Sequence, residues 1–137
     1  MTTNKIAHIG IAVSSLKDTL RLYHETLGIP LHGQETVPSD RVTVAFLPIG
    51  DTEIELLEPT DSESPVARFI EKRGEGVHHL AFEVENIEQA LTRLKQQGYR
   101  LIDEQPRVGA GGVRVAFVHP KSTGGVLIEL CEKQDPS

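Results

Sequence analysis

Two histidines and two glutamates occupy equivalent places in the two halves of this sequence. His8 and His79 lie 71 residues apart, and Glu55 and Glu129 lie 74 residues apart, each within a matching stretch. Imidazole nitrogens and carboxylate oxygens bind divalent metals, and two carboxylates neutralise the charge of a dication. The alternative is a polar cleft in which separate hydrogen-bonded histidines stand beside Glu–Arg pairs. The symmetric set of four favours one metal site, with open positions for water or substrate oxygens.

These four residues belong to an internal repeat. Residues 6–34 match residues 77–105, residues 43–46 match 114–117, and residues 54–56 match 128–130. Any two αβ segments share some patterning, but four anchors in the same order favour a duplication. We therefore predict one functional domain over residues 1–137. It consists of module 1 at about residues 5–60, a linker helix at about 61–75, and module 2 at about 76–133.

Each module is predicted to fold as a strand, a helix and three further strands, which makes the chain an α+β protein. Apolar residues alternate in the first segment and then recur at helical spacing. Ser15 or its neighbour Ser14 caps the first helix, Asn86 caps the second, and Gly28 and Gly98 end them. The expected strands are residues 6–13, 31–36, 42–48 and 52–57 in module 1, and the strand containing His79 with residues 100–104, 113–119 and 126–131 in module 2.

Strand alternation decides which side chains share a face. Successive side chains point to opposite sides of a strand, so His8 shares a face with the small residues Gly10 and Ala12. In the matching strand, His79 shares a face with Ala81. We expect these faces, together with those of the two glutamates, to line one cleft, while the alternate apolar residues pack against the helices.

Composition excludes several other classes of protein. The 137 residues are 38% hydrophobic and 25% charged, as in a folded globular domain, and the net charge of −6 disfavours non-specific nucleic-acid binding. No apolar run approaches the length of a membrane helix, and the N-terminus lacks the apolar region of a signal peptide. A single cysteine rules out an internal disulfide, so we expect a cytoplasmic protein.

The remaining reactive side chains are weaker candidates for a site. His78 is expected to point away from the face of its neighbour, and His24 and His32 are expected at the surface. Cys131 shares a predicted face with Glu129, but nothing marks it as a nucleophile. Lys121 lies in a turn before the last strand and is a candidate contact for an anionic substrate, although a solvated lysine is the commoner case.

The motifs HIGIAV, HHLAFEV, IELLEP and GGVLIEL in this duplicated pattern resemble the vicinal oxygen chelate superfamily. Within it, GVHHLAFEV and GAGGVRVAFVHPKSTGGVLIEL resemble the methylmalonyl-CoA epimerases, over residues 6–132. The resemblance implies the glyoxalase-like fold, in which two βαβββ modules form a half-open barrel with a cleft. It also implies that one divalent ion (Co, Ni, Mn or Zn) is held at the positions of His8, Glu55, His79 and Glu129.

The implied activity is the interconversion of (2R)- and (2S)-methylmalonyl-CoA by removal and return of an α-proton, through an enolate stabilised by the metal. Glu129 is the first candidate for the general base, and Glu55 is the candidate for the opposite face of the substrate. Some epimerases carry glutamine at the position of Glu55 and a candidate base glutamate at the position of Thr43; this chain has a carboxylate at Glu55 and none at Thr43. The resemblance also implies a homodimer and a CoA thioester substrate.

Three other activities fit the same scaffold. A glyoxalase I-type lactoylglutathione lyase uses a similar set of four ligands and a similar proton transfer on a glutathione adduct. A metal-free protein that sequesters a ligand needs no complete ligand set. A dioxygenase uses two histidines and one carboxylate, and a fourth protein ligand occupies a position that oxygen requires.

Overall fold

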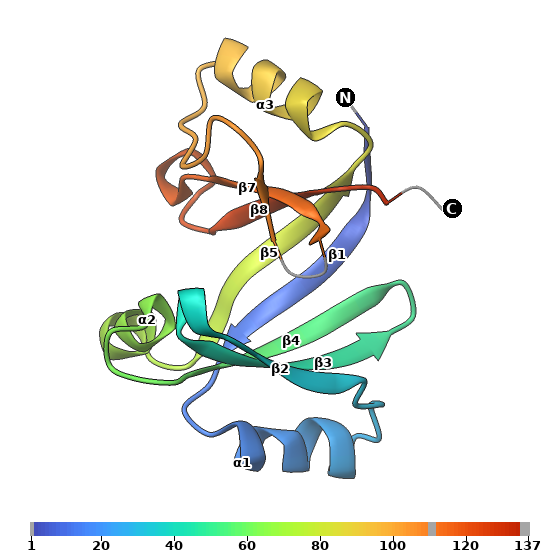
Figure 1. Cartoon of the computed structure of the whole chain (residues 1–137), viewed down its shortest axis with the longest axis vertical. Helices are drawn as coiled ribbons and strands as arrows, with labels where there is room; N and C mark the ends of the chain where they lie inside the picture. Colours follow the sequence, from blue (N-terminus) through green and yellow to red (C-terminus); the bar gives the residue numbers. More distant parts are fainter. Residues whose placement is uncertain (1, 110–111, 135–137) are drawn as a thin grey trace. The chain divides into compact units, whose positions relative to one another are not determined.

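The computed structural model describes residues 2–109 and 112–134, and these form an α+β fold. Eight strands make one mixed sheet in the order β2-β3-β4-β1-β5-β8-β7-β6 (Figure 1). The elements, in chain order, are β1 (Thr3–Ala12), α1 (Leu16–Leu20), the π-helical turn η1 (Arg21–Thr26), β2 (Gly33–Val37), the 3₁₀ turn η2 (Pro38–Asp40), β3 (Val42–Ile49), β4 (Thr52–Pro59), α2 (Pro65–Arg73), β5 (Gly76–Val84), α3 (Ile87–Gln96), β6 (Arg107–Val108), β7 (Arg114–Val118), the 3₁₀ turn η4 (Pro120–Ser122) and β8 (Ile128–Glu132).

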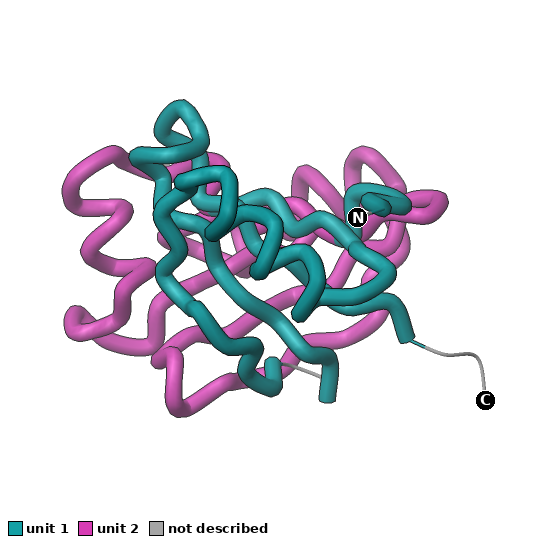
Figure 2. Tube along the Cα trace, turned by 90° about the horizontal axis from the view of Figure 1, so that it is seen from above, with its two compact units in different colours: residues 1–7, 79–137 teal, residues 8–78 magenta. Residues whose placement is uncertain are grey.

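The chain divides into two compact units that are interleaved in sequence. Unit 1 comprises Met1–Ala7 with His79–Ser137, and unit 2 comprises His8–His78 (Figure 2). Strand β1 contributes its first half to unit 1 and its second half to unit 2. Each unit therefore contains one half of the same strand.

In unit 2, helices α1 and α2 each pack against the sheet in a separate apolar cluster. Leu16 of α1 is buried with Leu47 of β3 and Leu56 of β4, and the N-cap Ser15 Oγ accepts from the Asp18 N–H at 3.1 Å. Val66 of α2 is buried in the other cluster, with Ala12, Val42, Val44 and Leu57. Because Leu56 and Leu57 are neighbours on one strand, the two clusters lie on opposite faces of the sheet.

In unit 1, α3 covers one face of its part of the sheet (Figure 1). The Asn86 side chain caps this helix by accepting from the Gln89 N–H at 3.0 Å, as the sequence predicts. The helix buries Ile87 and Leu91 against a cluster that includes Val84 of β5, Val118 of β7 and Leu130 of β8. A smaller cluster on the opposite face contains Ala81, Val115 and Cys131 with Ala7 of β1.

The strand register is equivalent around the two glutamates. In unit 2, Glu55 of β4 lies between Gly10 of parallel β1 and Phe46 of antiparallel β3. In unit 1, Glu129 of β8 lies between Ala81 of parallel β5 and Phe117 of antiparallel β7. All of these positions match between the two repeats, so each glutamate has the same backbone surroundings.

The expected strand at residues 100–104 is wrong. Only an isolated bridge joins Leu101 to Val118, and the short edge strand is β6 instead. The reason is that a side chain takes a hydrogen bond that a regular strand would make with its backbone. The Phe117 N–H donates to Asp103 Oδ2 at 2.8 Å. The Ile102 and Asp103 N–H groups both donate to the Phe117 carbonyl. This pattern ends the pairing that a regular strand requires.

The other differences concern the ends of elements. The first helix continues beyond Leu20 as the π-helical turn η1, β2 begins at Gly33, and β8 begins at Ile128. The linker helix is α2, whose cap Ser64 accepts from the Val66 N–H at 3.2 Å. Within residues 2–109 and 112–134, no helix has the length and apolar character needed to cross a membrane.

Candidate metal and proton-transfer site

The first histidine–glutamate pair lies on β1 and β4 of unit 2. His8 is two residues before Gly10, which is the register partner of Glu55, so the two side chains share one face of the sheet. The His8 Nδ1 atom lies 3.3 Å from Glu55 Oε2, and about one sixth or less of each side chain is exposed. Gly10 of β1 lies opposite Glu55 and has no side chain, so it leaves space for the His8 and Glu55 side chains to meet.

The second pair repeats this arrangement in unit 1. His79 is two residues before Ala81, the register partner of Glu129. The His79 Nε2 atom lies 3.6 Å from Glu129 Oε1. Both residues are buried, with relative exposures of 7% each. The structure thus places each predicted histidine beside its predicted glutamate within the same unit.

The two glutamates differ in one neighbour. The Cys131 thiol donates a hydrogen bond to Glu129 Oε2 at 3.1 Å, and this cysteine is buried beside Ala81 and Val115. At the matching position of the other repeat stands Leu57, which has no donor. Sequence reasoning placed Cys131 on the face of Glu129 but assigned it no contact, although the i, i+2 spacing was a signal for one.

The Arg107 guanidinium lies over the ring of Phe117, on the face of unit 1 that carries Glu129. Phe117 is the register partner of Glu129, and its ring meets the His79 imidazole edge-on with centroids 6.3 Å apart. The Arg107 guanidinium lies over this ring, 5.2 Å from the centroid, and its Nε is 3.7 Å from Asp103 Oδ2. The sequence pattern does not single out Arg107, because it predicts a strand at residues 100–104 and none at β6.

The structure also shows which residue of β3 shares the face of Glu55. Phe46 is the register partner of Glu55, so Val44, two residues away, lies on that face as well. Thr43 is paired with Glu58 and lies on the opposite face, where its Oγ1 is 3.1 Å from Thr36 Oγ1. Thr43 therefore has no direct role beside Glu55.

The other histidines lie where the sequence predicts. His78 packs edge-on against the ring of Phe69 in α2, with centroids 5.0 Å apart. His24 and His32 are exposed, and His24 Nδ1 lies 2.6 Å from the Ile29 carbonyl oxygen. His119 is the N-cap residue of η4, and its Nδ1 accepts from the Lys121 N–H at 3.1 Å.

The donor chemistry of these side chains fits a divalent cation. His8, His79 and Glu129 each offer one ligand atom for a metal ion. Nitrogen and carboxylate oxygen donors of this kind are used for zinc, cobalt, nickel and manganese, and do not by themselves select one of them. Glu55 lies beside His8 but does not belong to this group of three ligand atoms.

Comparison with known proteins identifies the family. Residues 7–117 match the Glyoxalase/Bleomycin resistance protein/Dioxygenase superfamily. The uncharacterized protein YqjC of Bacillus subtilis is 46% identical, covering 94% of this chain and 92% of that protein. The ethylmalonyl-CoA/methylmalonyl-CoA epimerase of Cereibacter sphaeroides is 41% identical, covering 92% and 96%. A variant of the Streptomyces coelicolor methylmalonyl-CoA epimerase, in complex with 2-nitronate-propionyl-CoA, is 36% identical with a TM-score of 0.90, covering 96% of both chains.

Proposed function

Because this chain belongs to the Glyoxalase/Bleomycin resistance protein/Dioxygenase superfamily, we propose that it is a metal-dependent epimerase that interconverts (2R)- and (2S)-methylmalonyl-CoA. The observation that carries this proposal is the pair of His–Glu contacts in identical register, His8 with Glu55 and His79 with Glu129. Relatives that resemble the chain over nearly their whole length are epimerases of this substrate class.

We propose that His8, Glu55, His79 and Glu129 together hold one divalent ion. Two neutral imidazoles and two carboxylates match its charge and its preferred donors. When bound, such an ion supplies a Lewis acid for the thioester oxygen, where negative charge develops as the α-proton leaves. In each half of the chain the proposed imidazole and carboxylate ligands already lie side by side, His8 with Glu55 and His79 with Glu129.

Glu129 is proposed as the general base. Its Oε1 faces His79, while its Oε2 accepts the Cys131 thiol hydrogen bond, so both oxygens have defined directions. A base so held reaches the α-carbon in one geometry, which favours proton transfer. Glu55 then serves the opposite face of the substrate, since it occupies the matching position in the other repeat. Return of the proton from this second face inverts the α-carbon.

Arg107 is proposed to attract the anionic substrate. The protein has a net charge of −6, which opposes the approach of a CoA ester. The guanidinium stacked on Phe117 places positive charge on the strand next to Glu129. It therefore offsets part of this repulsion, and its planar donors suit a carboxylate or a phosphate.

Two further properties belong to this proposal. A homodimer is proposed from the resemblance to the epimerases. A cytoplasmic location is proposed because the single cysteine is buried and a reducing compartment suits a chain with no possible internal disulfide.

The proposal is tested by deuterium wash-in at the α-carbon of methylmalonyl-CoA in D₂O, with the metal content measured on the same preparation. We expect exchange and epimerisation in the wild-type protein, and a loss of roughly 10²–10⁴-fold in both Glu129→Gln and Glu55→Gln. Full activity of Glu55→Gln refutes the role of two glutamates. Absence of exchange in metal-loaded wild-type protein refutes the epimerase.

The same preparation discriminates the rival functions. Turnover of the methylglyoxal–glutathione adduct without exchange on methylmalonyl-CoA identifies a lactoylglutathione lyase instead. A protein that takes up no metal after reconstitution favours ligand sequestration, because sequestration does not require the complete set of four ligands. Retention of one equivalent of metal in the wild type, and its weakened binding in His79→Ala, supports the proposed centre independently of turnover.

A further inference from the structure

A row of three residues, Gly109, Val115 and Cys131, crosses the sheet of unit 1 beside the proposed general base. Val115 of β7 is the register partner of Arg107 in β6 and of Cys131 in β8, so these side chains share one face. Gly109 lies two residues after Arg107, and its N–H donates to the Val113 carbonyl at 2.7 Å, which continues the pairing of the two strands. The position of a side chain at residue 109 is therefore on the same face as Val115.

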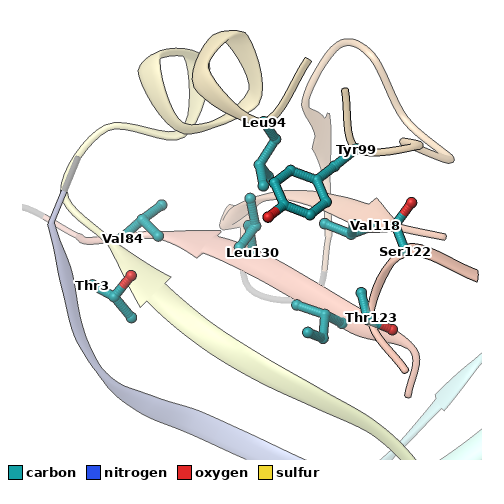
Figure 3. A pocket seen from close by; sticks show the side chains of 9 residues that line it. Thr3, Val84, Leu94, Tyr99, Val118, Ser122, Thr123 and Leu130 are labelled. Atoms are coloured by element: carbon teal, nitrogen blue, oxygen red, sulfur yellow. The ribbon is translucent and has the colours of Figure 1, made fainter. Parts of the chain in front are cut away.

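The opposite face of these strands contains the pocket bordered by α3 (Figure 3). Val84, Val118 and Leu130 line this pocket and belong to the buried core of unit 1. Val118 and Leu130 alternate along β7 and β8 with the residues of the row, so the pocket and the row lie on different sides of the sheet.

Gly109 approaches Val115 so closely that a side chain at residue 109 meets an obstacle. A Cβ atom on Gly109 would lie 3.1 Å from both Cγ atoms of Val115. Carbon atoms in favourable contact are about 3.5–4.0 Å apart, so one methyl group at this position already crowds the valine. The φ of Gly109 lies outside the left-handed region, so alanine fits the backbone and the obstacle is the contact alone.

The hairpin holds Gly109 in place, so Val115 must yield. The Gly109 N–H is bonded to Val113, and the Gly109 carbonyl accepts from the Gly112 N–H at 3.2 Å. A shift of Gly109 away from Val115 breaks these bonds. Val115 is buried in one cluster with Cys131, and a close-packed interior passes a displacement from one side chain to the next. Displaced Val115 methyl groups therefore push on Cys131.

Unit 2 fills the corresponding row with larger side chains. Val37, Val44 and Leu57 occupy the corresponding positions, because the register of β2, β3 and β4 repeats that of β6, β7 and β8. All three pack in one apolar cluster, and Leu57 carries no hydrogen-bond donor. The combination of a glycine and a thiol therefore occurs only in the row beside Glu129, whose Oε2 accepts from the Cys131 thiol at 3.1 Å.

We propose that Gly109 is a positioning residue for the general base: it leaves room for Val115 and thereby allows the Cys131 thiol to reach Glu129. This inference rests on the proposed function, because it concerns the base of the same reaction. A side chain at residue 109 displaces Val115, turns the thiol away from Glu129 and lowers the rate of proton transfer. The affinity for the substrate stays the same, because the residue acts through Val115 and Cys131 alone.

The test is a double-mutant cycle of Gly109→Ala and Val115→Ala, the second of which removes the crowded methyl groups. Each variant is assayed for kcat and KM with methylmalonyl-CoA, and the infrared S–H stretching band is recorded on the same preparations. The chain contains one cysteine, so this band reports on Cys131 alone. The matched control is Val37→Ile, which adds one methyl group at the corresponding position of unit 2.

We expect Gly109→Ala to lower kcat up to about fivefold at unchanged KM, as for the loss of one hydrogen bond from a weak donor. The S–H band moves to higher frequency, because a weaker hydrogen bond leaves a stronger S–H bond. In the Val115→Ala background the same substitution changes kcat less than about twofold and leaves the band in place. The control Val37→Ile keeps the wild-type kcat and band.

A wild-type kcat and band in Gly109→Ala overturn the inference, as does an equal fall of kcat in both backgrounds or in the control. A higher KM at unchanged kcat and band also overturns it, because the hairpin has then moved instead of Val115. If Gly109→Ala does not fold, Val115→Ile adds a methyl group to the same contact, and a wild-type kcat and band in that variant refute the role. If no preparation turns over methylmalonyl-CoA, the epimerase proposal fails, and the dependence of the S–H band on residues 109 and 115 still decides this inference.

Discussion

We predict that the hydrogen bond from the Cys131 thiol orients the Glu129 carboxylate and thereby raises the rate of proton transfer. Cys131 Sγ lies 3.1 Å from Glu129 Oε2, and both residues are 7% exposed, so water competes little for this bond. We consider three substitutions at this position. Alanine removes the donor and leaves a gap, valine removes the donor but fills the space, and serine keeps a donor.

The size of the effect follows from the strength of this hydrogen bond. Bonds to charged groups contribute about 1.5–3 kcal/mol, but a thiol is a weak donor, so we take about 1 kcal/mol. Since 1.36 kcal/mol corresponds to a factor of ten, loss of the bond lowers kcat about fivefold. The free energy of unfolding falls separately, by about 1 kcal/mol in Cys131→Ala, because the sulfur leaves a small cavity among Ala81, Val115 and Ala7.

The assay combines kcat for methylmalonyl-CoA with urea unfolding of the same preparations. We expect kcat to fall about fivefold in both Cys131→Ala and Cys131→Val, although valine restores the lost volume, and to recover in Cys131→Ser. The control is Leu57→Val at the matching position of the other repeat, which removes apolar volume but no donor. A wild-type kcat in Cys131→Val refutes the positioning role, and a kcat that follows stability across the series makes the residue a packing residue only.

Two other predictions concern single charges. Arg107→Gln is expected to raise KM for methylmalonyl-CoA roughly tenfold with little change in kcat, because the cation over Phe117 attracts the substrate without contacting the transferred proton. A fall in kcat at constant KM contradicts this prediction. A KM that depends less on salt in the variant than in the wild type supports it. The Glu63 N–H, and then the Arg41 guanidinium, hold the pKa of Asp61 below its ordinary 3.8. Ionised Asp61 therefore stabilises the folded state at pH values above 3.8, and this stabilisation is lost as the pH falls through the lower pKa of the folded state. The free energy of unfolding in urea, measured between pH 5 and 2, should depend less on pH in Asp61→Asn than in the wild type. An unchanged pH dependence refutes the lowered pKa of Asp61.

Much of the fold and the candidate site followed from local pattern. The repeat could be read because each half must cover one face of its own sheet, which forces the same alternation around His8 and His79. Caps such as Ser15 and Asn86 were predictable, because a helix end needs a side-chain acceptor close by in sequence. Residues 100–104 were mistaken for a strand because Asp103 takes the Phe117 N–H, a contact between segments 14 residues apart.

The sequence by itself determined the family, the two-module pattern and the identity of the four proposed ligands, because side-chain period and repeat spacing are properties of the chain alone. Only the tertiary structure decided what distinguishes the two halves. It placed the Cys131 thiol on Glu129 and the Arg107 guanidinium over Phe117. Except for the two-residue spacing of Cys131, these contacts join side chains from separate segments. Their formation depends on register and packing, which sequence periodicity does not encode.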